Sequence, residues 1–310
     1  MTKELLTDWD ETKAKAFAKE NIVAHHTAHE RDMFDDDKLA DLLDRYPRDA
    51  MGIYTMGVDP LDRGSFRAGN AKKLSGEDLL KAVHDGRIWI NMRKCNESLP
   101  EIHDLTEELF EAMEANTPGL KTLKHDTSIL ISSPNAQVFY HCDVPLVALW
   151  QIRGVKNVWL YPPTSPYLND YELETVVLKE SEEEIDFKLD FDRGALKVRL
   201  EPGMVATWPQ NGPHRIVNED MVNISLSCEF QTYQSLIRAN AIYANGVLRR
   251  NFGLNPSIEK DGVVGLHAKA VLARFFKLAK IRKAFAYHIP RTFEVDLGSE
   301  NAVRDIQPAT

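Results

Sequence analysis

Cysteine is scarce in this chain of 310 residues. The three cysteines, Cys95, Cys142 and Cys228, lie far apart and form no Cys-x-x-Cys pair, which argues against a disulfide framework and against a zinc knuckle. No run of about eighteen apolar residues occurs, and the N-terminus is charged from its start, so we expect neither a membrane-spanning helix nor a signal peptide. These features predict a protein of the reducing cytoplasm.

An excess of positive charge is also missing. The 38 basic residues are outnumbered by 47 acidic ones, which gives a net charge of -9 and argues against general affinity for nucleic acid. The hydrophobic content of 43% is enough for a sizeable core, in one elaborated domain or in two.

The first third of the chain mixes helical and strand patterns. Acidic residues precede leucines at helical spacing in FDDDKLADLLDRYP, and Ser75 followed by Glu77 and Asp78 is typical of a helix start. We expect helices within 8–45, one over 10–20 and one ending before Pro47, and then a strand at 51–56, a loop at 57–73, a helix at 75–84, a strand at 87–92 and an amphipathic helix at 100–115.

From residue 127 onward the pattern changes to short strands separated by turn signals. The segments that indicate strands are SILISS, AQVFYH, LVALWQI, NVWLYPP, ETVVL, ALKVRL, MVATWP and VNISLSCEF. About eight strands at this spacing predict a jelly-roll, that is, a double-stranded β-helix. The acidic segment 180–192 interrupts them, and we expect it to project as a solvated loop rather than to form a lid that recruits a basic substrate.

After Phe230 the pattern is helical again, at 233–250 and at 266–287. The second of these segments places Val271, Phe275, Leu278, Ile281 and Phe285 opposite a basic face. Such a face docks on the protein's own core or on a second subunit more often than on a membrane. We expect an N-terminal α/β elaboration at 1–126, a catalytic core at 127–231, a helical region at 232–310 and a disordered tail after residue 293.

The most informative residues are His141 and Asp143. They are two apart in a predicted strand, so their side chains leave the same face, and His214 is the candidate for a third ligand. Two imidazoles and one carboxylate form the facial triad of non-heme Fe(II) oxygenases. A His-x-Asp pair alone is a weak signal. A second metal site at His25, His26 and His29 is a less favoured hypothesis, because those histidines have no acidic or cysteine partner at suitable spacing.

The sequence around this pair resembles a known family. His141-Cys-Asp143, the hairpin Gln151-Ile-Arg-Gly154-Val-Lys156 and the following Leu-Tyr-Pro-Pro are similar to the Jumonji-C, cupin-like group of Fe(II) and 2-oxoglutarate-dependent oxygenases. Pro202-Gly203, Trp208-Pro209 and the strand Asn223-Ile-Ser225-Leu-Ser227 occupy further positions of the family pattern. The resemblance covers residues 127–231. It implies a double-stranded β-helix, Fe(II) held by His141, Asp143 and His214, and often a homodimer.

The resemblance also implies that Lys156 binds the far carboxylate of 2-oxoglutarate. A dicarboxylate that chelates iron through its 2-oxo acid end needs a cation at its other end, so the assignment makes physical sense without the family. Lys197 and Arg199 are alternatives that nothing ties to the metal strand. Where the family often has Thr or Ser and then Asn, this chain has Val138 and Val147. Further cosubstrate contacts are therefore assigned to Tyr140, Asn223 and Ser225, with Ser132 as another candidate.

These observations predict a 2-oxoglutarate-dependent hydroxylase that acts on a protein side chain, a peptide or a small metabolite. The implied reaction converts 2-oxoglutarate to succinate and carbon dioxide while the substrate is hydroxylated. Two alternatives stay open: a non-catalytic cupin-like binding or regulatory protein, and a metal-dependent cupin enzyme that does not use 2-oxoglutarate. Only an enzyme that binds the dicarboxylate needs the charge of Lys156.

Overall fold

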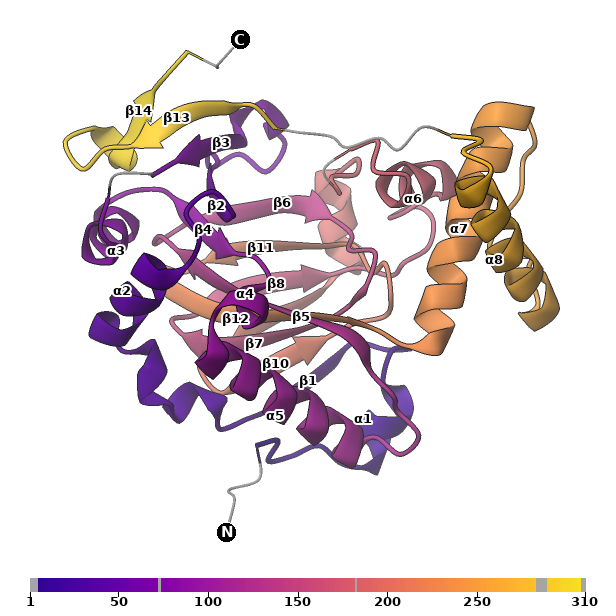
Figure 1. Ribbon diagram of the computed structural model, residues 1–310, viewed down its shortest axis with the longest axis horizontal. Helices are drawn as coiled ribbons and strands as arrows, with labels where there is room; N and C mark the ends of the chain where they lie inside the picture. Colours follow the sequence, from indigo (N-terminus) through magenta and orange to yellow (C-terminus); the bar gives the residue numbers. More distant parts are fainter. Residues whose placement is uncertain (1–4, 72–73, 182, 283–288, 308–310) are drawn as a thin grey trace.

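Two β-sheets form the centre of the molecule (Figure 1). The computed structural model describes the whole chain except residues 1–4, 72–73, 182, 283–288 and 308–310. In spatial order, the ten-stranded sheet contains β1 (Ile22–His25), β10 (Met204–Thr207), β7 (Leu146–Arg153), β12 (Asn223–Gln231), β5 (Leu123–Ser132), β4 (Trp89–Met92), β2 (Met51–Thr55), β3 (Arg67–Asn70), β13 (Arg291–Val295) and β14 (Val303–Asp305).

The second sheet has four strands, β6 (Gln137–His141), β11 (His214–Asn218), β8 (Lys156–Leu160) and β9 (Leu196–Leu200). All neighbouring strands in both sheets are antiparallel except β13 and β3, which are parallel. Apolar side chains from the two sheets pack against each other, including Val147 and Leu149 of β7 with Val158 and Leu160 of β8. This arrangement confirms the predicted jelly-roll, mainly-β class with added helices.

The strand β7 shows why its residues 146–150 form a continuous apolar run. Val147 and Leu149 face the inner core between the sheets, whereas Ala148 and Trp150 belong to the outer core. A strand buried on both faces reads as a continuous apolar run instead of an alternating one.

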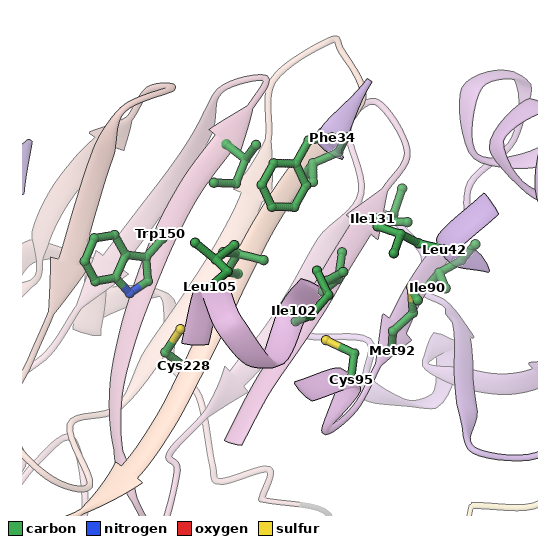
Figure 2. Close-up of a cluster of buried hydrophobic side chains, with 14 of the residues drawn as sticks. Phe34, Leu42, Ile90, Met92, Cys95, Ile102, Leu105, Ile131, Trp150 and Cys228 are labelled. Carbon is green, nitrogen blue, oxygen red and sulfur yellow. The ribbon is translucent and has the colours of Figure 1, made fainter. Parts of the chain in front are cut away.

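The outer core is covered by α5 (Pro100–Asn116), which lies across the large sheet. Figure 2 shows Ile102 and Leu105 of this helix pointing toward Ile131, Trp150 and Cys228 on the strands beneath. All five of these side chains are buried. The helix therefore rigidifies the strands whose opposite faces line the interior between the sheets.

The other α-helices are α1 (Glu11–Ala16), α2 (Asp36–Arg45), α3 (Gly76–Asp85), α4 (Cys95–Ser98), α6 (Asp170–Val177), α7 (Tyr233–Phe252) and α8 (Val263–Leu278). The helices expected before Pro47, after Ser75, at 100–115 and at 233–250 are confirmed. Ser75 caps α3 as predicted, with Asp78 completing a capping box. Within the described residues, no helix is both long enough and apolar enough to cross a membrane.

Several expectations about local structure were wrong. The loop expected at 57–73 contains the strand β3. The segment ETVVL is not a strand but part of α6, because Asn169 caps the helix and Glu172 completes a capping box that outweighs the β-branched residues. The helix expected at 10–20 is only α1, capped by Asp10, and the strand β1 follows it. The tail is ordered at β13 and β14, where Phe293 is fully buried beside β3.

Buried ion pairs attach α6 to α7. The carboxylate of Glu174 on α6 accepts hydrogen bonds from Arg249 Nε at 2.7 Å and from Arg250 Nη1 at 2.8 Å. Its side chain is only 2% exposed. Arg250 also donates to Glu180, which begins the acidic segment, so the helices at this end hold that segment in place.

Candidate metal centre and adjoining cavity

The register of the small sheet brings the predicted metal ligands together. His141 is the last residue of β6 and His214 is the first of β11, and the two are direct cross-strand partners. Asp143 follows His141 by two residues, and its Oδ2 lies 3.5 Å from Nε2 of His214. One donor atom from each of the three residues lies within 4.8 Å of the others.

Backbone carbonyls orient both imidazole rings. Nδ1 of His141 lies 2.8 Å from the carbonyl oxygen of Phe139, and Nδ1 of His214 lies 3.1 Å from that of Gly212. A proton on each Nδ1 donates to these oxygens, which leaves each Nε2 with a free lone pair. Histidines that bind metals have their second nitrogen held in this way, so the donor set fits a divalent ion.

Burial sets the protonation of the three side chains. It lowers the pKa of both histidines, well below the usual value for His214, so both are neutral as metal ligation requires. Burial raises the pKa of Asp143 to about 7, and the charge of Arg93 acts in the opposite direction. A divalent cation would offset this cost of a buried carboxylate. Two nitrogens and one oxygen match the facial triad used for Fe(II).

Hydrogen bonds from side chains behind the metal ligands connect the segment after β6 with the turn before β11. Asn211 Nδ2 donates to the carbonyl oxygen of Asp143 at 2.8 Å, and Gln210 Nε2 donates to that of Val144 at 3.0 Å. Both donors come from the turn that leads into His214. The Trp208 ring, with its centroid 4.5 Å from that of His214, packs on the same side.

A cavity of about 250 Å³ opens beside the three ligands. Both sheets contribute to its walls, for example through Leu130 of β5 in the large sheet and Ile216 of β11 in the small sheet. The N-terminal region adds residues that were not singled out from the sequence, among them Trp89 and Asn91 of β4. The alternation in RIWINM could have identified Trp89 and Asn91 from the sequence. Ile90 and Met92 are buried on the outer face of the sheet, so the side chains between them face the cavity.

Lys156, the first residue of β8, lies in a small adjoining cavity of about 20 Å³. The lysine is 2% exposed, and burial lowers its pKa to about 7. Within the described residues its amine has no hydrogen-bond acceptor or carboxylate partner. The residues that line both this cavity and the metal cavity are Trp89, Leu130, Val138 and Ile216. These four side chains therefore lie between the cavity that holds Lys156 and the metal ligands.

Three of the predicted cosubstrate residues, Tyr140, Asn223 and Ser225, line neither cavity. Tyr140 points away from His141, and its hydroxyl donates to the carbonyl oxygen of Tyr167 at 2.8 Å. Ser225 donates to Gln151 Oε1 at 2.7 Å, and Gln151 Nε2 donates to Asn223 Oδ1 at 2.7 Å. These groups satisfy one another within the protein. The polar neighbours of Lys156 are Ser132, Gln137 and Asn218, and only Ser132 was considered from the sequence.

The histidines near the N-terminus have structural partners. Nε2 of His26 lies 3.1 Å from the carbonyl oxygen of Met204, and its Nδ1 accepts from Ala28 N–H at 3.1 Å. Burial lowers the pKa of His26 to about 4. His25 pairs with Asp8 instead. Among the described residues, the metal-ligand geometry is met by the centre at His141 and not here.

The acidic segment does not project into solvent as expected. Its residue Glu184 forms a β-bridge with His141, and the backbone N–H of Cys142 donates to the carbonyl oxygen of Glu183. Ile185 is buried, and Arg63 donates to its carbonyl oxygen. Part of the segment thus lies along β6 beside the metal ligands, and Glu183 lines the metal cavity.

No protein-family model and no curated protein sequence matches this chain. Solved structures do match. The chain is 16% identical to YcfD, a ribosomal oxygenase from Escherichia coli solved with cobalt and 2-oxoglutarate, at a TM-score of 0.52 over 90% of this chain and 68% of that one. A further E. coli YcfD structure matches at 16% identity and a TM-score of 0.50, over 91% and 70% of the two chains. The chain therefore has the double-stranded β-helix fold of these structures.

Proposed function

We propose that this protein is an Fe(II) and 2-oxoglutarate-dependent oxygenase that hydroxylates a protein side chain, a peptide or a small metabolite. His141, Asp143 and His214 would hold the iron, and Lys156 would bind the distal carboxylate of 2-oxoglutarate. The observation that carries the proposal is the combination of the triad with a buried, unpaired lysine in the adjoining cavity. The likeness in fold to a protein solved with cobalt and 2-oxoglutarate supports it.

In this proposal, the residues around the centre bind the metal and the cosubstrate and hold them in orientation. When bound, iron and 2-oxoglutarate supply the oxidising chemistry, and the cosubstrate leaves as succinate and carbon dioxide. The protein orients the imidazoles through Phe139 and Gly212, positions the dicarboxylate through Lys156 and surrounds the centre with apolar side chains that limit access of water. A cupin enzyme that does not use 2-oxoglutarate would leave a costly buried lysine without a role.

Anaerobic titration tests this proposal. We expect the purified protein to bind one equivalent of Fe(II) and then to develop a visible metal-to-ligand charge-transfer band when 2-oxoglutarate is added. Succinate is the control ligand and should produce no such band, because it lacks the 2-oxo acid group that chelates the metal. Iron binding without a band would contradict the use of 2-oxoglutarate, and failure to bind iron would favour a non-catalytic binding protein.

We propose the division into a catalytic core at 127–231 with additions at 1–126 and 232–310. We also propose a cytoplasmic location. The three cysteines are buried and free, a state that a reducing compartment preserves.

A homodimer formed through α8 is proposed as well. The helix packs on α7 through Ala273 and Phe276, whereas Val271, Phe275 and Leu278 on its predicted apolar face are 71%, 58% and 75% exposed. Phe285, also assigned to this face, lies outside the described residues. Exposed apolar side chains at helical spacing are typical of a subunit interface.

Sedimentation equilibrium checks the dimer. We expect a wild-type mass of twice 35.2 kDa, and a Phe275→Glu protein close to the monomer mass because a buried charge opposes association. Lys38→Glu, at an exposed position of α2 away from α8, is the matched control and should remain dimeric. A monomeric wild type at micromolar concentration would contradict the proposal.

A further inference from the structure

A second cavity, of about 490 Å³, lies where α6 and the first turns of α7 and α8 meet the start of β7. Figure 1 shows these three helices together at one end of the molecule. Within the described part of the chain, no residue lines both this cavity and the metal cavity. Its volume is in the range of small-molecule binding sites. The cavity is therefore separate from the proposed iron and 2-oxoglutarate site.

One part of the wall of this second cavity is apolar. Leu168, Leu173 and Ile258 are buried side chains that line it from α6 and from the loops before α6 and α8. The other apolar residues of the wall are Ala18, Leu146, Pro163, Pro209 and Leu266. An apolar group of a ligand would lose contact with water against this wall, which favours binding.

Arg238 of α7 also lines the second cavity and has no partner. The side chain is half-buried, and within the described residues no hydrogen bond or ion pair reaches its guanidinium group. The other two arginines of α7, Arg249 and Arg250, both pair with the carboxylate of Glu174. A guanidinium group presents a planar set of donors that matches a carboxylate. Arg238 thus offers a free carboxylate-binding group to the cavity.

Two carboxylates, those of Asp170 and Glu259, line the second cavity together with Arg238. Burial lowers the pKa of Arg238, and the charges of these carboxylates act in the opposite direction, so all three groups are near one another. Neither carboxylate is within ion-pairing distance of the guanidinium group in the described structure. Asp170 begins α6, where the helix dipole stabilises it, but Glu259 lies in a loop without such support. The cavity therefore holds one cation apart from two anions.

We propose that the second cavity binds a free amino acid with a large apolar side chain. The carboxylate of the ligand pairs with Arg238, its ammonium group pairs with Glu259 and Asp170, and its side chain packs on the apolar wall. This site is distinct from the metal centre and adds a second ligand to the protein.

Other classes of small anion fit the charges less well. A dicarboxylate or a phosphate would be repelled by Asp170 and Glu259. A monocarboxylate without an amine would pair with Arg238 but leave both acidic side chains unpaired. A zwitterion places one charge of the correct sign against each group, and the apolar wall then selects among amino acids by their side chains.

Isothermal titration calorimetry of the purified full-length protein tests the inference with leucine, methionine and phenylalanine. We expect at least one of them to bind with a Kd of about 1 mM or tighter. The same amino acid should bind at least about tenfold more tightly than its N-acetyl derivative, its amide and glycine, because each of these lacks one of the three interactions. Absence of binding by all three amino acids up to about 10 mM would overturn the inference, as would equal binding of the derivatives.

Variants assign the binding to this cavity. Arg238→Met removes the charge but keeps an unbranched side chain, and it should weaken binding of the amino acid at least about tenfold. Arg193→Met, at an exposed position outside the cavity, is the matched control and should bind as the wild type does.

Glu259→Gln provides a second test that does not depend on the folding of the Arg238 variant, because Glu259 is exposed in a loop. It should reduce the preference for the free amino acid over its N-acetyl derivative, since the ammonium group loses one of its partners. Binding that is unchanged in Glu259→Gln and in Arg238→Met would show that the amino acid binds elsewhere. Failure to form the charge-transfer band with 2-oxoglutarate would contradict the oxygenase proposal alone, because the two cavities share no wall residue.

Discussion

An Asp143→Ala protein is expected to bind Fe(II) more than about 100-fold more weakly than the wild type and to lose 2-oxoglutarate turnover. Loss of groups that only support metal ligands costs 10–100-fold in affinity, so loss of a ligand should cost more. Asp143 supplies the single anionic donor of the centre, and without it two neutral imidazoles remain. Metal content after anaerobic loading and gel filtration measures the loss directly.

The same variant should not lose stability in the absence of metal. Burial raises the pKa of Asp143 to about 7, so above that pH the apo protein carries a poorly solvated carboxylate that alanine removes. Thermal unfolding of apo wild type and apo Asp143→Ala at pH 8 checks this point. Asp104→Ala, an exposed position on α5, is the control for iron binding. Normal iron content in Asp143→Ala would contradict the assignment of the centre.

Iron binding by the wild type should depend on pH through Asp143. The proton must leave the carboxylate before it can bind a cation, so iron affinity should fall as the pH decreases below about 7. The histidines should not add to this dependence near neutrality, because burial lowers the pKa of each and both are already neutral.

Replacement of Lys156 by methionine is expected to have two large and opposite effects. The affinity for 2-oxoglutarate should fall at least about 30-fold, because the distal carboxylate would lose its buried cation; such losses are roughly 2–5 kcal/mol. Apo stability should rise, because a depression of the pKa from 10.5 to about 7 corresponds to a cost on the order of 5 kcal/mol for the buried ammonium. Titration of the charge-transfer band and urea unfolding measure these effects.

The pH dependence of the stability difference has a defined sign. Between about pH 7 and 10.5 the unfolded chain keeps the proton on Lys156 while the folded protein releases it, so wild-type stability should rise with pH in this window. The advantage of Lys156→Met should therefore be greatest below pH 7 and vanish near pH 10.5. The affinity of the wild type for 2-oxoglutarate should decrease above pH 7, since binding requires the protonated amine.

Lys197→Met is the matched control for the cosubstrate. Lys197 lies on the adjacent strand β9, is exposed and sits over the Trp159 ring at 4.7 Å. Its loss should leave 2-oxoglutarate binding unchanged. The opposite pattern, with weak binding in Lys197→Met and normal binding in Lys156→Met, would show that the cation was assigned to the wrong strand.

Local patterns in the sequence were sufficient for most elements of the fold. The period-two and continuous apolar runs predicted the core strands, and the Ser75 cap predicted α3, because these signals involve residues close together in the chain. The pair His141 and Asp143 is local as well, since a strand directs residues two apart to one face. Helix α6 was missed where a capping box and β-branched residues indicated different structures.

What only the tertiary structure decided is how distant strands are aligned. His214 meets His141 because β11 pairs with β6, and Glu229 faces Asp126 because β12 pairs with β5. The burial of Lys156 and the contribution of Trp89 and Asn91 to the cavity likewise depend on long-range pairing. The sequence by itself determined which side chains could hold iron and a dicarboxylate. The alignment of the metal ligands and the burial of Lys156 arise from the register between distant strands, which local patterns do not encode.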